Sequence, residues 1–119
     1  MSNERKNYDL EDRTGRFGEG IIDFVKTLPK NRIKDELISQ IVRSGTSIGA
    51  NYMEADAAES KKDFRHKIAI CKKESKETKH WLRMIAKANP NKRDECKKLW
   101  GEAQELTLIF SSMLSSKNK

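Results

Sequence analysis

The stretch that most constrains the fold runs from residue 60 to residue 88 and reads SKKDFRHKIAICKKESKETKHWLRMIAKA. It contains neither Pro nor Gly, and small or apolar side chains recur in it at the spacing of an α-helix. The residues on this face are Phe64, Ile68, Cys71, Thr78, Leu82 and Ile85. The pattern predicts one long helix from Ser60 to Ala88, with Ser60 as its N-cap.

The same helix holds the excess positive charge of the chain. Residues 61–93 contain twelve Lys or Arg against three acidic residues, whereas the whole chain has a net charge of +7. An excess of this kind indicates a negatively charged partner, such as nucleic acid, a ribonucleoprotein or an acidic protein surface.

Three further amphipathic helices are expected on the same grounds. Their approximate ranges are Asp12–Leu28, a segment that begins between Asn31 and Lys34 and ends near Ala58, and Asp94–Leu114. Pro29 and Pro90 mark two of the breaks. Four helices with short loops and no strand-like alternation predict an all-α, antiparallel up-down-up-down four-helix bundle. We expect a flexible N-terminal arm over residues 1–11, a single bundle domain over 12–114 and a frayed tail over 115–119.

The predicted core faces of these three helices are apolar at helical spacing. They comprise Phe17, Ile21, Phe24, Val25 and Leu28, then Leu37, Ile38, Ile41, Val42, Ile48, Tyr52 and Ala55, and finally Cys96, Leu99, Ala103, Leu106, Ile109, Phe110 and Met113. Gly45 and Gly49 interrupt the second set four residues apart. Because glycine inside a helix costs stability, this pair indicates that another backbone comes close.

Composition bears on the location of the protein. The sequence has no run of 18 apolar residues, and its first residues, MSNERKNYDLEDR, lack the apolar core of a secretion signal. Cys71 and Cys96 fall on apolar faces, as expected of buried free thiols in a reducing compartment. We therefore expect a cytoplasmic protein with no membrane association.

Catalytic and metal-binding patterns are poor in this sequence. Di-iron bundles need two Glu-x-x-His motifs on different helices, but the single Glu-x-x-His here, Glu77 to His80, is joined only by Asp63 to His66 on the same helix. Both histidines point away from the apolar face, and phosphate-binding loops are absent. We expect no metal, no cofactor, no catalytic residue, no small-molecule substrate and no enzymatic activity.

A polar set accompanies the core of the second helix. Arg43, Ser47, Asn51 and Glu54 are spaced by four, four and three residues, and Glu74, Glu77 and Trp81 share one flank of the long helix. Partly buried charges need partners, so we expect Arg43 to pair with Glu74 or Glu77. Such a network suits a structural role in helix register or a subunit contact, and a ligand site is the alternative.

The opposite flank of the long helix is cationic. We call this flank the basic stripe; it consists of Lys61, Arg65, Lys72, Lys76, Lys79, Arg83 and Lys87. Like charges at this spacing repel each other, and they suit contact with a phosphate backbone. No aromatic residue interleaves the stripe in the sequence, so we expect nonspecific binding of structured RNA by charge or shape, without base stacking. A solvated helix face and a scaffold that recruits an acidic protein partner are the alternatives.

Three segments resemble a known family: DLEDRTGRFGEGIIDFVKTLPK, then ISQIVRSGTSIGANYMEA followed by SKKDF, and CKKESKETKHWLRMI. They are similar to the four-helix bundle family also called the S23 ribosomal protein or 23S rRNA intervening-sequence protein family. The resemblance extends from Tyr8 to about Ile109. Its motif positions correspond here to Arg43, Ser47, Asn51, Glu54, Glu74, Glu77, Trp81 and Leu82. The sequence departs from the pattern at Ser44 and Gly45, where many relatives have alanines, and at Gly49, where many have proline.

The resemblance implies an antiparallel four-helix bundle that assembles into a homopentameric ring. Some members are encoded within the intervening sequences of bacterial 23S rRNA genes, and a distant relative, the accessory variability protein of diversity-generating retroelements, binds a reverse transcriptase and nucleic acid. An established activity is absent for most members. An oligomer also suits the large side chains Tyr52, Ile70, Trp81 and Trp100, which exceed what a thin core must hold.

Overall fold

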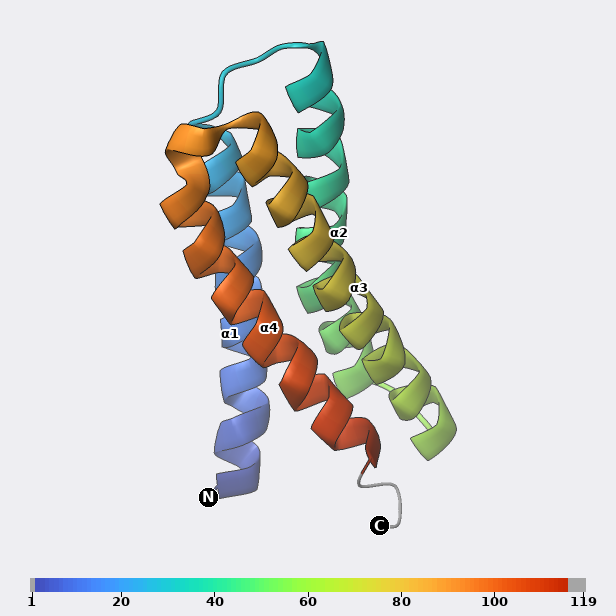
Figure 1. Cartoon of the computed structure of the whole chain (residues 1–119). Helices are drawn as coiled ribbons and strands as arrows, with labels where there is room; N and C mark the ends of the chain where they lie inside the picture. Colours follow the sequence, from blue (N-terminus) through green and yellow to red (C-terminus); the bar gives the residue numbers. More distant parts are fainter. Residues whose placement is uncertain (1, 116–119) are drawn as a thin grey trace.

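The structure is a computed structural model that describes the backbone of residues 2–115 and the side chains of residues 10–115. It contains helices α1 (Ser2–Val25), α2 (Arg32–Asp56), α3 (Lys61–Ala88) and α4 (Arg93–Ser115), with a short 3-10 helix, η1 (Pro90–Lys92), before α4. Successive helices run antiparallel, so that α1 begins and α4 ends at the same end of the bundle (Figure 1). Residues 2–115 include no strand. The predicted all-α four-helix bundle is confirmed.

Side-chain caps define two of the helix starts. The Oδ1 atom of Asn31 accepts a hydrogen bond from the backbone N–H of Lys34 at 2.9 Å, and the Oγ atom of Ser60 accepts one from the N–H of Asp63 at 3.0 Å. Both caps satisfy amides that have no partner within the helix. The predicted starts of α2 and α3 are therefore right, and Ser60 is the N-cap that the sequence indicated.

The bounds of the first helix differ from the prediction. The helix begins at Ser2 instead of Asp12, so that residues 2–11 of the segment expected to be an arm are helical, and Leu10 among them is buried. It ends at Val25, three residues before Leu28, where the N–H of Leu28 bonds the carbonyl of Val25 at 3.1 Å in a tighter turn. This turn brings Leu28 into the core although it lies outside the helix. The residues 116–119 of the expected tail lie outside the described part of the chain.

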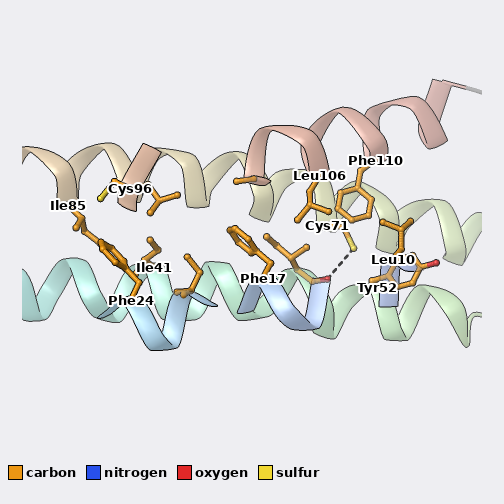
Figure 2. Packing of buried hydrophobic residues seen from close by; sticks show 14 of the residues in the cluster. Leu10, Phe17, Phe24, Ile41, Tyr52, Cys71, Ile85, Cys96, Leu106 and Phe110 are labelled. Atoms are coloured by element: carbon orange, nitrogen blue, oxygen red, sulfur yellow. Dashed lines mark hydrogen bonds between the residues drawn. The ribbon is translucent and has the colours of Figure 1, made fainter. Parts of the chain in front are cut away.

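The core extends along the whole bundle and draws on all four helices. Figure 2 shows Phe24, Ile41, Ile85 and Cys96 toward one end, and Leu10, Tyr52, Cys71 and Phe110 toward the other. The rings of Tyr52 and Phe110 lie 6.5 Å apart, and Tyr52 is 1% exposed. Tyr52 is thus a core residue, and the expectation that it contributes to a subunit contact is wrong.

Helices α1 and α2 approach each other closely at the glycines. A Cβ atom added to Gly49 would lie 3.4 Å from the carbonyl oxygen of Thr14, and one added to Gly45 would lie 3.0 Å from Cγ1 of Ile21. Gly18 on α1 meets the α2 backbone in the same region, with its Cβ position 3.6 Å from the Cα of Thr46. The close backbone approach indicated by the sequence is confirmed, and α1 is the partner.

Several small polar residues are buried in positions that apolar periodicity does not reveal. The hydroxyls of Thr14, Ser75 and Thr107 donate to the carbonyls four residues earlier, at 2.8, 2.9 and 2.8 Å. Because a hydroxyl satisfied by its own helix needs no outside partner, these residues fit an apolar core.

None of the helices in residues 2–115 combines the length and the hydropathy that a membrane span requires.

Candidate functional site

One polar site joins α2 to α3. Nη1 of Arg43 lies 3.2 Å from Oε1 of Glu74, and Nη2 of Arg43 donates to Oε2 of Glu77. The same Oε2 accepts a hydrogen bond from the indole Nε1 of Trp81 at 3.1 Å. We call Arg43, Glu74, Glu77 and Trp81 the seam network. The sequence predicted that Arg43 pairs with Glu74 or Glu77, and in the structure it contacts both glutamates.

The environment of the two glutamates differs. Glu74 is 7% exposed and depends on the Arg43 guanidinium to balance its charge, because a buried carboxylate without a partner is costly. For Glu77, burial raises the pKa, but the Trp81 N–H and the Arg43 guanidinium outweigh it, so that the pKa lies below its ordinary value. The charged form of the Glu77 carboxylate is thus stabilised in the fold.

The other polar residues of α2 do not join this network. The Ser47 hydroxyl donates to the carbonyl of Arg43 at 2.5 Å, and Nδ2 of Asn51 donates to the carbonyl of Ser47 at 2.9 Å. Glu54 forms an ion pair with Lys67 at 2.7 Å. Ser47 and Asn51 bind their own helix and Glu54 binds Lys67, so the four-residue set of α2 shares no common partner within the described residues.

The histidines lie on the surface of α3. His66 and His80 are both exposed, and the His80 ring packs edge-on against Trp81 with centroids 4.8 Å apart. Within the described residues, no group of three or more His, Cys, Asp or Glu side chains is arranged to hold a metal ion. Cys71 and Cys96 are free and buried, as the sequence predicted.

The basic stripe lies on α3, and two of its residues adjoin α4: Lys79 contacts Gln104, and Arg83 lines a hollow together with α4 residues. Lys61, Lys76, Arg83 and Lys87 are exposed, and Arg65, Lys72 and Lys79 are half-buried. In the described part of the chain no stripe residue forms an ion pair, whereas Lys67, on another face of α3, pairs with Glu54. The stripe is therefore a row of cations that the described fold does not neutralise.

Helix α4 adds an aromatic residue and further cations beside Lys79 and Arg83. The Nζ atom of Lys79 donates to Oε1 of Gln104 at 2.5 Å and lies 5.0 Å from the ring centroid of Trp100. Beside this contact is a shallow groove of about 320 Å³, which we call the Trp100 groove. Its lining consists of Leu82, Arg83, Ala86, Arg93, Cys96, Lys97 and Trp100.

The expectation that no aromatic residue accompanies the stripe is thus wrong for the folded protein, because Trp100 of α4 lies beside Lys79. It is right only for the order of residues within α3. Trp100 belongs to a different helix, so the sequence of α3 alone gives no sign of it. A signal was present in α4, where Arg93, Lys97, Trp100 and Gln104 follow a spacing of four, three and four. That spacing places all four side chains on one edge of a helix.

A further polar contact, which sequence reasoning missed, joins α1 to α4. Nε of Arg13 lies 2.6 Å from Oε2 of Glu102, and its Nη2 lies 2.7 Å from Oε1 of Glu105. The hydrogen bond to Glu102, with a further one to Glu105, raises the pKa of Arg13 above its ordinary value. Since both acids of this contact are engaged at α1, they lie away from the edge that holds Trp100.

Comparison with known proteins identifies a family and a similar solved structure. The family model described as 23S rRNA-intervening sequence protein matches residues 6–112. A crystal structure of a protein with unknown function from the S23 ribosomal protein family of Bacteroides thetaiotaomicron is similar, with a TM-score of 0.79 and 30% identity. That similarity covers 88% of this chain and 97% of the other. No curated protein matches the sequence. Because the family model spans nearly the whole bundle, the chain belongs to the 23S rRNA-intervening sequence protein family.

Proposed function

We propose that this protein is a non-enzymatic, homo-oligomeric bundle that binds RNA or a ribonucleoprotein through the basic stripe. The observation that supports this most is that all seven stripe residues lack an ion-pair partner among the described residues, although the chain contains 18 acidic residues. A phosphate backbone supplies the missing negative charge at short, regular intervals. The buried free thiols Cys71 and Cys96 agree with a reducing compartment such as the cytoplasm.

The direct test is a salt titration of binding to a structured RNA. Each phosphate contact releases counterions, so the logarithm of the binding constant falls with the logarithm of salt concentration by about 0.7 to 0.9 per contact. We expect the substitutions Lys72→Gln, Lys76→Gln and Arg83→Gln together to lower this slope by about 2. Circular dichroism at each salt concentration verifies that the helical content is unchanged.

A control with the same charge change separates the stripe from general attraction. The substitutions Lys26→Gln, Lys30→Gln and Lys98→Gln remove three exposed cations elsewhere and lower the net charge of +7 by the same amount. We expect this control to keep the slope of the parent protein. Equal losses in the two triple variants, or a parent affinity that does not depend on salt, would contradict the role of the stripe.

The oligomeric part of the proposal rests on exposed apolar side chains. Ile33, Met53 and Leu108 are 71%, 59% and 58% exposed, and Trp81 is only partly buried beside the seam network. Apolar and aromatic side chains of this kind are favoured at subunit interfaces. Light scattering should give a mass of five times 13.7 kDa for the homopentamer, and a monomeric mass would refute the ring.

The same cations also suit an acidic protein surface, the alternative expected from the sequence. Co-purification distinguishes the two, because an RNA-bound protein releases its partner on nuclease treatment. A defined protein partner that remains bound after nuclease digestion would replace RNA with a protein in the proposed function.

A further inference from the structure

We infer that the Trp100 groove binds an unpaired nucleotide of a single-stranded RNA, with its base against Trp100 and its phosphates on the surrounding cations. This inference rests on the proposed function and extends it, since the basic stripe alone provides only nonspecific phosphate contacts. It makes the edge between α3 and α4 a site that distinguishes single-stranded from double-stranded RNA.

The charge of the groove favours an anionic occupant. Arg83 comes from α3, and Arg93 and Lys97 come from the first turns of α4, so cations from two helices surround one hollow. The lining contains no acidic residue. None of these three cations forms an ion pair within the described residues. A second groove of the same kind, from another copy of this chain, would bring like charges together.

The aromatic side of the groove favours a flat, partly apolar group. Trp100 is 41% exposed, which is a large exposure for an indole, and Leu82, Ala86 and Cys96 provide the apolar part of the lining. The Lys79 ammonium lies 5.0 Å from the indole centroid and donates to Gln104, so that the tryptophan is held from α3. Bases stack on aromatic side chains of this kind in proteins that bind single strands.

The dimensions agree with a single nucleotide. A hollow of about 320 Å³ is at the lower limit of pockets that bind small ligands. The bases of an RNA duplex are stacked on each other and cannot enter the Trp100 groove, whereas an unpaired base can turn outward from its strand. A groove of this size beside a row of cations thus suits one base, with the strand continuing along the basic stripe.

The experiment compares two oligomers that carry equal charge. One is an oligouridylate of about twelve nucleotides, and the other is a matched oligomer in which stable abasic sites replace the bases. We expect the parent protein to bind the oligouridylate about tenfold more tightly, which is the usual magnitude of a base stacked on an aromatic ring. Trp100→Ser should abolish this preference, and Trp100→Tyr should keep most of it.

Two control variants separate stacking from charge and from exposed apolar area. Ile22→Ser removes an apolar side chain of α1 that is 42% exposed, close to the 41% of Trp100, and that lies outside the groove, so it should leave the base preference intact. The pair Arg93→Gln and Lys97→Gln should weaken both oligomers by the same factor, because phosphates are common to both. Since Trp100 and Ile22 are exposed, neither substitution is expected to alter the helical content.

Each other outcome contradicts the inference in a distinct way. A parent protein with salt-dependent binding but no base preference, or a preference that survives Trp100→Ser, overturns the inference and leaves the proposed function standing. Failure to bind either oligomer or structured RNA overturns both. The surface of α1 around Glu11 and Glu19, from another copy of this chain, is a competing occupant of the groove. The only cation in the described lining of that surface is Arg16, which pairs with Asp12. A change in the mass of the assembly on Trp100→Ser, without any change in base preference, would identify the groove as that subunit contact.

Discussion

The replacement Arg43→Met isolates the contribution of the seam network to stability. Methionine keeps the length of the apolar stem, but it removes the only cation that contacts Glu74 in the described residues. Leaving a buried charge without its partner costs about 3 to 5 kcal/mol, and removing an exposed pair costs about 0.2 to 1 kcal/mol. This pair lies between the limits, since the Glu74 side chain is 9% exposed and the Arg43 side chain is 46% exposed. We therefore expect a loss of about 2 kcal/mol in the free energy of unfolding.

A double-mutant cycle tests the reason for this loss. Glu74→Met should cost less than Arg43→Met, because the half-exposed guanidinium keeps Glu77 and water as partners. The double variant should regain much of the stability, since an apolar pair leaves no buried charge. We expect a coupling energy of about 1 to 2 kcal/mol.

Urea unfolding at neutral pH, followed by circular dichroism, measures each corner of the cycle. The loss expected for Arg43→Met corresponds to a fall in melting temperature of about 8 °C for a domain of this size. Arg16→Met is the matched control, because its pair with Asp12 has side chains that are 77% and 57% exposed, and it should cost no more than about 0.5 kcal/mol. A cost for Arg43→Met that is the same with and without Glu74 would refute the reasoning.

Three further predictions concern the core and its titratable groups. Gly45→Ala should destabilise the fold by about 1 kcal/mol in urea unfolding, because the new Cβ lies 3.0 Å from a buried isoleucine, while Gly101→Ala, with nothing within 4 Å, should stabilise it by about as much. Burial raises the pKa of the Cys71 thiol to about 12 and that of Cys96 to about 11. Iodoacetamide reacts with the thiolate, so at mildly alkaline pH it should label neither cysteine until urea is added. Labelling of the native protein would contradict this expectation. The fold lowers the pKa of Glu77, so the ionised carboxylate stabilises the folded state at pH values above the ordinary pKa of a glutamate. This stability is lost as the pH falls through the lowered pKa of the folded state. The difference in unfolding free energy between the parent protein and Glu77→Gln should therefore shrink from about pH 5 to about pH 3, and a constant difference would refute this.

The sequence predicted those parts of the fold that local patterns encode. The bounds of α2 and α3 followed from caps and breaks, such as the Ser60 side chain on the Asp63 amide. The end of α1 was predicted less well, because Leu28 is apolar at helical spacing and yet reaches the core from a turn. Periodicity reports which side chains are buried, and it does not report whether the backbone is still helical there.

One of the candidate sites could be predicted from the sequence, and the other could not. The pairing of Arg43 with Glu74 and Glu77 could be anticipated, since charges beside two core faces must meet where the helices pack. The approach of Trp100 to Lys79 could not, because it depends on the rotation of α4 relative to α3. That rotation is fixed by the packing of many core side chains, and a single helix pattern leaves it open.

Charge is distributed over the bundle in a way that connects the two proposals. The acids that face another helix have cationic partners there. Glu74 and Glu77 of α3 pair with a cation on α2, and Glu102 of α4 pairs with a cation on α1. Apart from Arg65 and Lys72, consecutive stripe residues lie three or four positions apart on one helix, and like charges at this spacing cost about 0.2 to 0.5 kcal/mol for each neighbouring pair. An acid from α4 would relieve this repulsion, but the α4 side of the Trp100 groove contributes Arg93 and Lys97 instead. The fold thus concentrates repulsion at the edge that also exposes an indole, and an anionic strand with unpaired bases satisfies both features at once.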